Sequence, residues 1–309
     1  MNLTKSFSEK YGTLLVFLAA LMWATDAPFR VHLTSTLSSE FIVLIEHFIS
    51  ILLLSPILLP AVRELKTFNK KEWVSILIIG FGGSALSLVL FTQAFAYMNP
   101  SVVIILQKVQ PFIAIFLATY ILNEFRNKKF WFWALVAIVG AYVVSFPDFA
   151  PQLYEGEVFN PNIIGILLAL GAALLWGSST VLGRYLLVNR DFKTITALRF
   201  LTAFVFLLGW NVANSSITQI SHLTATDWLF LIIIAIVSGV VSLFIYYKGL
   251  SHTKASVATI AELGFVGGAV IINYFFLNAT LVPMQVLGML VILFAVWRLN
   301  KVSNVETQS

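Results

Sequence analysis

Six ionisable side chains fall inside long apolar stretches of this 309-residue sequence, and they have the clearest capacity for chemistry. Three acids stand against three bases: Asp26, Glu46 and Glu262; Arg30, Lys108 and Arg199. A charge at the centre of a lone apolar helix costs about 2.5–3.5 kcal/mol on insertion scales. Six unpaired charges would cost roughly 15–20 kcal/mol, more than the net stability of about 5–15 kcal/mol of a typical protein. We therefore expect them to face one another, water or a bound molecule.

Asp26 and Arg30 are spaced i and i+4, so they share one face of a helix. Pro28 lies between them and predicts a bend where the pair sits. Two interpretations remain open: a structural ion pair that closes the outer half of a helix bundle, or a gate or substrate contact at the outer mouth of a cavity.

Glu46 and Arg199 also have two interpretations each. Glu46 is either a proton-exchanging acid or contact for a substrate amine, or a structural partner of Arg199 or Lys108. Arg199 lies five or six residues from the inner end of its apolar stretch. It could therefore extend to the interface, or serve as an inner gate or phosphate contact.

Lys108 is flanked by Gln107 and Gln110, and Gln107 aligns with Glu262 in the second half of the chain. These two segments are the best candidates for cavity walls. Lys108 and Glu262 could bind the carboxylate and the amine of a zwitterion, or they could form an internal bridge.

Trp23 and Trp176 occupy matching positions in the two halves. They predict either apolar or cation–π walls of a cavity, or helix packing. Tyr246 and Tyr247 lie near the end of an apolar stretch, where tyrosine by default belongs to an interfacial belt.

The composition places all these residues in a membrane. Hydrophobic residues make up 59% of the chain and charged residues 11%, against about a quarter charged in soluble proteins. A bilayer core of about 30 Å needs roughly 20 apolar residues per helix. That length predicts ten spans: 12–34, 38–60, 73–97, 101–122, 129–147, 163–187, 194–213, 226–250, 255–277 and 281–298.

The basic residues predict the orientation of these spans. All lysines and arginines except Arg30, Lys108 and Arg199 fall at the ends of spans or in connections that share one side of the membrane. Since cytoplasmic segments carry an excess of Lys and Arg, we expect both termini to be cytoplasmic.

The two halves of the chain resemble each other. GTLLVFLAALMWATDA, from Gly12, aligns with GILLALGAALLWGSST, from Gly165, at an offset of 153 residues. EWVSILIIGF matches DWLFLIIIAI, and NPSVVIILQKVQP matches KASVATIAELGFV, both at an offset of 155. Each half has five spans, an odd number, so the second copy must enter the membrane from the opposite side. This predicts an inverted repeat of the kind that secondary transporters use.

Several motifs resemble the EamA family of the drug/metabolite transporter superfamily. They are the stretches Ala20 to Arg30 and Ala173 to Arg184, Leu198-Arg199-Phe200, Ala255-Ser256-Val257-Ala258, Gln110-Pro111 and Asn123-Glu124. The sequence departs from the family where Glu46-His47-Phe48 replaces the usual Arg-Phe, and where Asn278-Ala279 lacks the acid that ends the fourth span. The resemblance implies a bundle of ten helices around a central substrate cavity.

We therefore expect an all-α integral membrane protein with ten transmembrane helices arranged as two inverted five-helix repeats. The first EamA-like repeat covers residues 1–147, an outer linker loop 148–162, the second repeat 163–300, and a polar, disordered tail 301–309.

The predicted function is a secondary transporter that moves a small organic metabolite across the inner membrane by alternating access. Balanced buried charges favour an amino acid or a related zwitterionic or amphipathic solute, and the family resemblance implies export. A multidrug or nucleotide/sugar-type exchanger of the same superfamily is the alternative within this class. A proton is a candidate coupling ion, with Glu46, Glu262 and Asp26 as candidate sites in that order.

Other classes fit the sequence less well. No GxxxxGK[ST] motif for ATP hydrolysis and no HExxH motif is present, cysteine is absent, and the four histidines are scattered. We expect no cofactor, no metal, no enzymatic activity and no nucleic-acid partner. An intramembrane enzyme or a channel is the alternative from a different class, and the sequence does not predict the oligomeric state.

Overall fold

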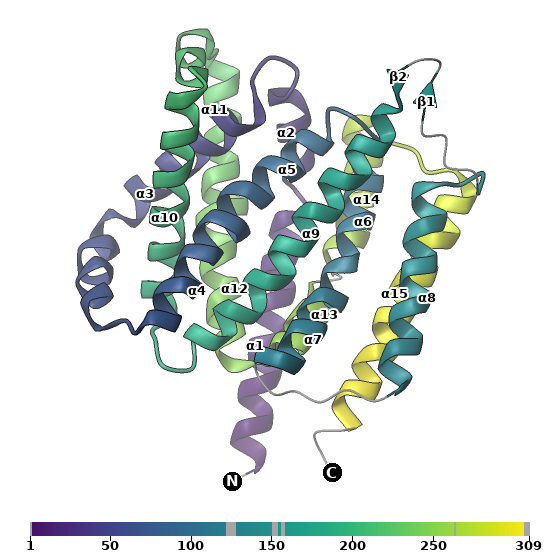
Figure 1. The fold of residues 1–309 in the computed structure, drawn as a ribbon, viewed down its shortest axis with the longest axis horizontal. Coiled ribbons are helices and arrows are strands. Elements are labelled where there is room, and N and C mark those ends of the chain that lie inside the picture. Colours follow the sequence, from purple (N-terminus) through teal and green to yellow (C-terminus); the bar gives the residue numbers. More distant parts are fainter. Residues whose placement is uncertain (1, 122–127, 150–153, 156–157, 263, 306–309) are drawn as a thin grey trace.

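The computed structural model describes residues 2–121, 128–149, 154–155, 158–262 and 264–305 (Figure 1). This described part of the chain is almost entirely helical. The first half contains α1 (Asn2–Trp23), α2 (Ala27–Leu33), α3 (Ser39–Glu64), η1 (Leu65–Thr67), α4 (Lys70–Gly80), η2 (Phe81–Leu86), α5 (Ser87–Ala94), α6 (Pro100–Leu106), η3 (Gln107–Val109), α7 (Gln110–Ile121) and α8 (Lys128–Ser145).

The second half begins with a two-stranded antiparallel hairpin that lies in the predicted linker loop. Its elements are β1 (Tyr154–Glu155), β2 (Val158–Phe159), α9 (Pro161–Leu186), α10 (Phe192–Ala213), η4 (Ser216–His222), α11 (Ala225–Ile233), η5 (Ile234–Val241), α12 (Ser242–His252), α13 (Ala255–Ala261), α14 (Gly264–Leu277) and α15 (Pro283–Val305). The helix α15 continues to Val305, so the expected disorder of the tail is wrong for residues 301–305. A helix can add turns beyond the apolar stretch wherever its backbone carbonyls find the next N–H groups.

Seven helical stretches in the described residues are long and apolar enough to cross a membrane. They are Tyr11–Leu33, Ser39–Thr67, Lys70–Ala94, Pro100–Ile121, Pro161–Leu186, Phe192–Ala213 and Ala225–His252. Three shorter apolar helices, Trp131–Ser145, Gly268–Leu277 and Pro283–Ala295, lie where the fifth, ninth and tenth spans were predicted. The protein is therefore a multi-pass membrane protein, and each predicted span coincides with helix.

Polar caps start several of these helices. Asn99 accepts a hydrogen bond from the backbone N–H of Ser101 at 2.9 Å and precedes Pro100 at the first helical position, as its sequence predicts. Asn160 before Pro161 repeats the arrangement at the start of α9. Such caps fix where each helix begins, so the register of the side chains along it is set from that end.

Corresponding helices of the two halves begin at constant offsets. The starts of α3 and α10 are 153 residues apart, whereas those of α4 and α11, α5 and α12, α6 and α13, and α8 and α15 are 155 residues apart. The π-helical turns η2 and η5 interrupt the third and eighth spans at corresponding places. The fourth and ninth spans are both broken, at η3 and at Glu262.

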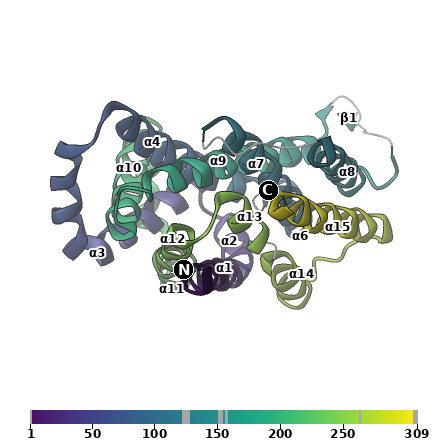
Figure 2. The ribbon, with the colours of Figure 1, turned by 90° about the horizontal axis from the view of Figure 1, so that it is seen from below.

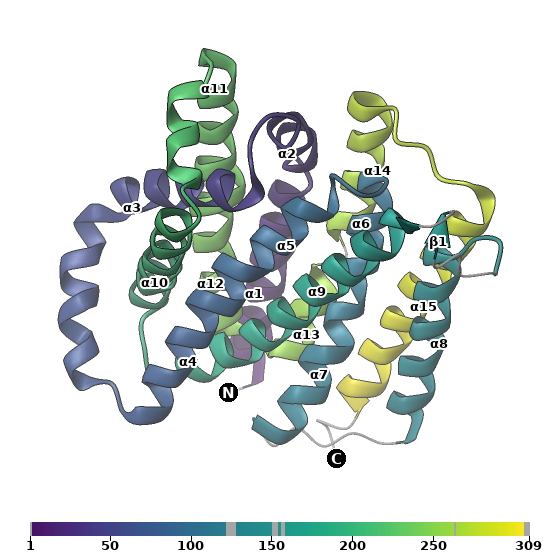
Figure 3. The same cartoon turned by 45° about the horizontal axis from the view of Figure 1, so that its top comes forward.

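The helices pack in pairs that respect this correspondence. α3 packs on α10, α8 on α15, and α6–α7 on α14 and α13, while α1 packs on α12 just as α9 packs on α4 and α5 (Figures 1 and 3). Seen from below, α4, α9 and α7 form one layer and α12, α1 and α14 the opposite one (Figure 2). The start of α1 and the end of α15 lie at the same end of the molecule (Figure 1). Exchanging the two halves therefore maps each of these contacts onto another.

Candidate substrate cavity

A cavity with about 870 Å³ of empty space lies between the two layers. That size is within the range of about 300–1,000 Å³ that is typical of small-molecule sites. All ten residues that the sequence proposed for a site line it: Trp23, Asp26, Arg30, Glu46, Gln107, Lys108, Gln110, Trp176, Arg199 and Glu262.

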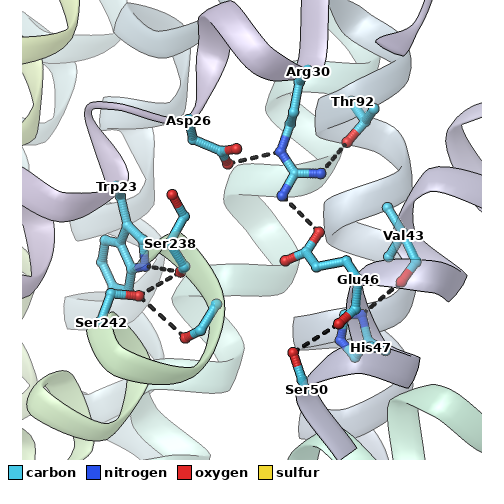
Figure 4. A network of polar contacts seen from close by, with 11 residues as sticks. Trp23, Asp26, Arg30, Val43, Glu46, His47, Ser50, Thr92, Ser238 and Ser242 are labelled. Carbon is cyan, nitrogen blue, oxygen red and sulfur yellow. Dashed lines mark hydrogen bonds and ion pairs between the residues drawn. The ribbon is translucent and has the colours of Figure 1, made fainter. Parts of the chain in front are cut away.

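Arg30 is the centre of the largest charged network in the cavity wall (Figure 4). Its Nε donates to Asp26 Oδ2 at 2.7 Å, one terminal nitrogen donates to Glu46 Oε2 at 2.7 Å, and the other donates to Thr92 Oγ1 at 3.2 Å. The guanidinium is 1% exposed. The predicted Asp26–Arg30 pair is therefore confirmed, and it joins the first span to the second and third.

Two expectations about this network are wrong. Glu46 pairs with Arg30, not with Arg199 or Lys108, because α2 turns Arg30 towards α3. The helix is interrupted at Ala24–Asp26, and Pro28 lies in the first turn of the new helix α2 rather than inside a bent one. Proline fits there because the first turn of a helix has no partners for its N–H groups.

Arg199 does not extend to the interface, as one interpretation held, but is buried in the cavity wall. It donates to Ser84 Oγ at 2.5 Å, to Ser179 Oγ at 3.1 Å, to Tyr247 Oη at 2.9 Å and to the carbonyl oxygen of Gly83. All of these partners are neutral. The π-helical turn η2, which contains Gly83 and Ser84, presents two of them.

Lys108 and Glu262 do not form the internal bridge that was one interpretation of them. Within the described residues Lys108 has no ion pair inside 4.0 Å, and its ammonium lies over the ring of Phe265, 4.3 Å from the centroid. Glu262 Oε2 accepts from Gln110 Nε2 at 2.8 Å. The charge of Lys108 nevertheless acts on Glu262 across the cavity.

Two aromatic pairs face the cavity from opposite layers. Trp23 lies 5.2 Å from Tyr246, centroid to centroid, and Trp176 lies 5.2 Å from Phe91. Trp23 corresponds to Trp176 at the offset of 153, and Phe91 corresponds to Tyr246 at 155. The two pairs are thus copies of one arrangement. The sequence analysis found the tryptophans but missed Phe91.

The expected interfacial role of Tyr246 and Tyr247 is wrong, since both rings are buried. Tyr246 lines the cavity and its hydroxyl lies 3.0 Å from Thr180 Oγ1, while Tyr247 contacts Arg199. Both residues are displaced inward because α12 packs along α1. The offset of 155 from Phe91, an aromatic residue in a polar segment, was the available signal.

The correspondence between halves breaks down at one charged position. Glu46 of α3 and Arg199 of α10 match at the offset of 153, and both line the cavity with opposite charge. Their neighbours His47 and Phe200 also match, and these two rings lie 5.3 Å apart. His47 Nδ1 donates to the carbonyl oxygen of Val43 at 2.9 Å, so Nε2 is left towards the cavity residues.

Three buried polar atoms of cavity residues have no hydrogen-bond partner among the described residues. They are Asp26 Oδ1, His47 Nε2 and Glu262 Oε1. An unsatisfied buried polar group costs about 1–3 kcal/mol. Unmet hydrogen-bonding capacity in a cavity wall is typical of a site that is completed by a ligand.

Two polar contacts outside the cavity were not anticipated. At the end of the molecule that holds the termini, Arg190 donates to both carboxylate oxygens of Glu72, each at 2.8 Å. At the opposite end His32 Nε2 lies 3.6 Å from Asp227 Oδ1. The Glu72 carboxylate raises the pKa of Arg190 above its ordinary value. The capping-box patterns Asn69 to Glu72 and Thr224 to Asp227 were the signal for both acids.

The described residues contain no group of three or more His, Cys, Asp or Glu side chains that could hold a metal ion. The residue types in the cavity wall suit an organic ligand instead, since aromatic rings, amides and hydroxyls surround a few charges.

The model of the EamA-like transporter family matches this chain twice, over residues 10–146 and 163–300. The chain therefore belongs to the EamA-like transporter family. The two matches coincide with the two sets of corresponding helices.

Individual relatives agree with this assignment. The chain is 29% identical over 296 residues to the riboflavin transporter ImpX of Fusobacterium nucleatum, covering 94% of this chain and 98% of that protein. It is 22% identical over 205 residues to the uncharacterized transporter YetK of Bacillus subtilis, covering 66% and 61%. A solved crystal structure with 14% identity superposes with a TM-score of 0.59 over 92% of this chain and 94% of the other, a likeness of fold alone.

Proposed function

We propose that this protein is a secondary transporter that carries a flat heteroaromatic metabolite of the riboflavin type across the inner membrane by alternating access. The observation that carries the proposal is the pair of matched aromatic walls, Trp23 with Tyr246 and Trp176 with Phe91. Aromatic side chains bind flat rings by stacking, and the two walls approach the cavity from opposite layers.

The polar residues of the cavity suit the same class of molecule. Gln107 and Lys108 lie together at the break in the fourth span and offer N–H donors to the carbonyl oxygens of a ring. The relative from Fusobacterium nucleatum carries the name of a riboflavin transporter and aligns over nearly the whole chain. Riboflavin combines a flat ring that bears carbonyl and N–H groups with a chain of hydroxyls.

The proposal includes ten transmembrane helices in two inverted repeats, with both termini cytoplasmic. The matched starts of the helices, the paired packing and the double family match support it. The position of the basic residues at the end that holds the termini supports the orientation. In such an arrangement, rocking of one repeat against the other exposes the same cavity to each side in turn.

Glu262 is the first candidate for a coupling proton, ahead of Glu46 and Asp26. The structure reverses the earlier order because Glu46 and Asp26 share the guanidinium of Arg30, whereas Glu262 accepts only from the neutral amide of Gln110. A carboxylate held by a cation gives up its charge less readily than one held by an amide.

An amino acid or related zwitterion is the second candidate substrate. It is favoured by one observation: the ammonium of Lys108 and the carboxylate of Glu262 both line the cavity without pairing with each other. Export is the direction that the family resemblance implies for either substrate.

Transport of riboflavin into and out of proteoliposomes, followed by its fluorescence, tests the proposal. Stacking on an aromatic side chain contributes about 1–3 kcal/mol per ring. Trp23→Ala and Trp176→Ala should therefore each weaken riboflavin binding by roughly tenfold or more, since 1.4 kcal/mol is a factor of ten.

The matched control is Trp73→Ala, which removes a half-exposed tryptophan that does not line the cavity. Its transport should equal that of the native protein. Transport of a labelled amino-acid mixture that both cavity substitutions abolish, with no movement of riboflavin, would replace the first candidate with the second. The direction is read from which loaded side empties.

A further inference from the structure

We infer that the polar part of the cavity selects an uncharged, hydroxyl-bearing solute and rejects the phosphorylated form of the same solute. This inference rests on the proposed function, and it names the chemical state in which the substrate is carried. The argument depends on which polar atoms of the cavity wall already have partners and which do not.

The unpartnered buried atoms are all hydrogen-bond acceptors. Asp26 Oδ1 and Glu262 Oε1 are carboxylate oxygens. His47 Nε2 is an acceptor as well, since Nδ1 carries the proton that is donated to Val43 in the neutral ring. What the wall lacks is therefore donors, and hydroxyl or N–H groups of a bound solute would supply them.

The cations of the cavity are mostly occupied. Arg30 is held by two carboxylates and a hydroxyl, and Arg199 donates to three hydroxyls and a carbonyl. Only Lys108 lacks an oxygen partner among the described residues, and the charge of Glu262 acts on it.

A phosphate group would fit this wall poorly. It carries about −1.5 to −2 charges near neutral pH and presents acceptor oxygens. Sites for phosphate gather arginine forks or backbone N–H groups around it. Here it would meet one lysine and the free oxygens of two carboxylates, whereas the hydroxyl chain of an uncharged solute would donate to those same oxygens.

Three fluorescent probes test the inference by titration against the purified full-length protein: riboflavin, riboflavin 5′-phosphate, and the flavin ring without its hydroxyl chain. The native protein should bind riboflavin at least tenfold more tightly than either of the others. Equal affinity for riboflavin and its phosphate would overturn the inference while leaving the proposed function standing. Failure of all three probes to bind would overturn both.

Charge-neutralising substitutions then assign the discrimination to particular atoms. Glu262→Gln keeps the shape of the side chain and removes the charge, and Asp26→Asn does the same beside Arg30. Each should reduce the ratio of affinities between riboflavin and its phosphate by at least threefold. Asp227→Asn is the matched control, because Asp227 lies outside the cavity, and it should leave the ratio unchanged.

Thermal unfolding of each variant, recorded beside the titration, separates loss of fold from loss of selectivity. Should Asp26→Asn fail to fold, Glu262→Gln carries the test alone. A ratio that stays at its native value in Glu262→Gln, in a folded protein that still binds riboflavin, would contradict the assignment of the wall.

Discussion

Glu72 and Asp227 occupy the same position in two capping boxes that lie 155 residues apart, and each faces a basic side chain from the other half of the chain. Glu72 accepts two hydrogen bonds from Arg190, and Asp227 lies 3.6 Å from His32. One contact joins the halves at the end that holds the termini, the other at the opposite end (Figure 1). Only the second depends on a group that is charged when protonated.

The contact between Glu72 and Arg190 should stabilise the fold measurably. The Arg190 side chain is 16% exposed and that of Glu72 is 6% exposed, and the guanidinium also donates to Thr67. Arg190→Ala should lower the free energy of unfolding by about 1–3 kcal/mol, between the values for exposed and buried pairs. Denaturant unfolding in detergent measures this, with Lys71→Ala at an exposed position as the control. Equal losses in both variants would contradict it.

The contact between His32 and Asp227 should depend on pH. His32 attracts the carboxylate only when protonated, so its contribution is present at acidic pH and is lost as the pH rises. Its side chain is 51% exposed, which limits the contribution to about 1 kcal/mol or less. The melting temperature of the native protein should therefore exceed that of His32→Gln at acidic pH and equal it at alkaline pH. A difference that is constant across pH would refute the charge interaction.

Removing Arg30 should be the most damaging single change in the cavity. Arg30→Met leaves Asp26 and Glu46 as two buried carboxylates without a cation, and breaking a buried pair in this way costs about 3–5 kcal/mol. Glu46→Gln should cost less, since the pair of Arg30 with Asp26 remains. Chemical unfolding of the two variants gives the comparison, and a larger loss for Glu46→Gln would contradict the network as described.

The close contact of α1 with α12 should not tolerate a single added methyl group. A Cβ on Gly249 would lie 2.6 Å from the carbonyl oxygen of Gly12, which is backbone and cannot move alone. Gly249→Ala should therefore destabilise the protein by about 1–3 kcal/mol. Gly209→Ala is the matched control because nothing lies within 4 Å of its Cβ, and there alanine should be neutral or stabilising by up to about 1 kcal/mol. Thermal stability of the two variants distinguishes the effects.

The sequence predicted what local spacing and internal repetition determine. The spacing of Asp26 and Arg30 on one helix face predicted their ion pair, and the offset of 153 predicted the correspondence of Trp23 with Trp176. The same reasoning placed all ten proposed site residues on one cavity. Burying charge in an apolar environment costs so much that unpaired polar residues of different helices must gather, which is why this part succeeded.

Partners across helices could not be predicted in the same way. Arg30 was assigned to Asp26 alone, since nothing in the sequence states how α2 faces α3 or that Glu46 is within reach. Arg199 was expected at the interface because its depth was counted along a regular helix. The carbonyl of Gly83 that it reaches is turned out by a π-helical turn, which changes the ladder of backbone hydrogen bonds.

The opposite charges of Glu46 and Arg199 bear on the ancestry of the chain. A primitive protein made of two identical five-helix units would have placed two carboxylates, or two guanidiniums, at this level of the pore. Either unit alone would therefore have repelled its twin, and the present chain tolerates neither half in duplicate. Having diverged at this one position, the two halves became obligate complements, and the path back to a symmetric homodimer closed.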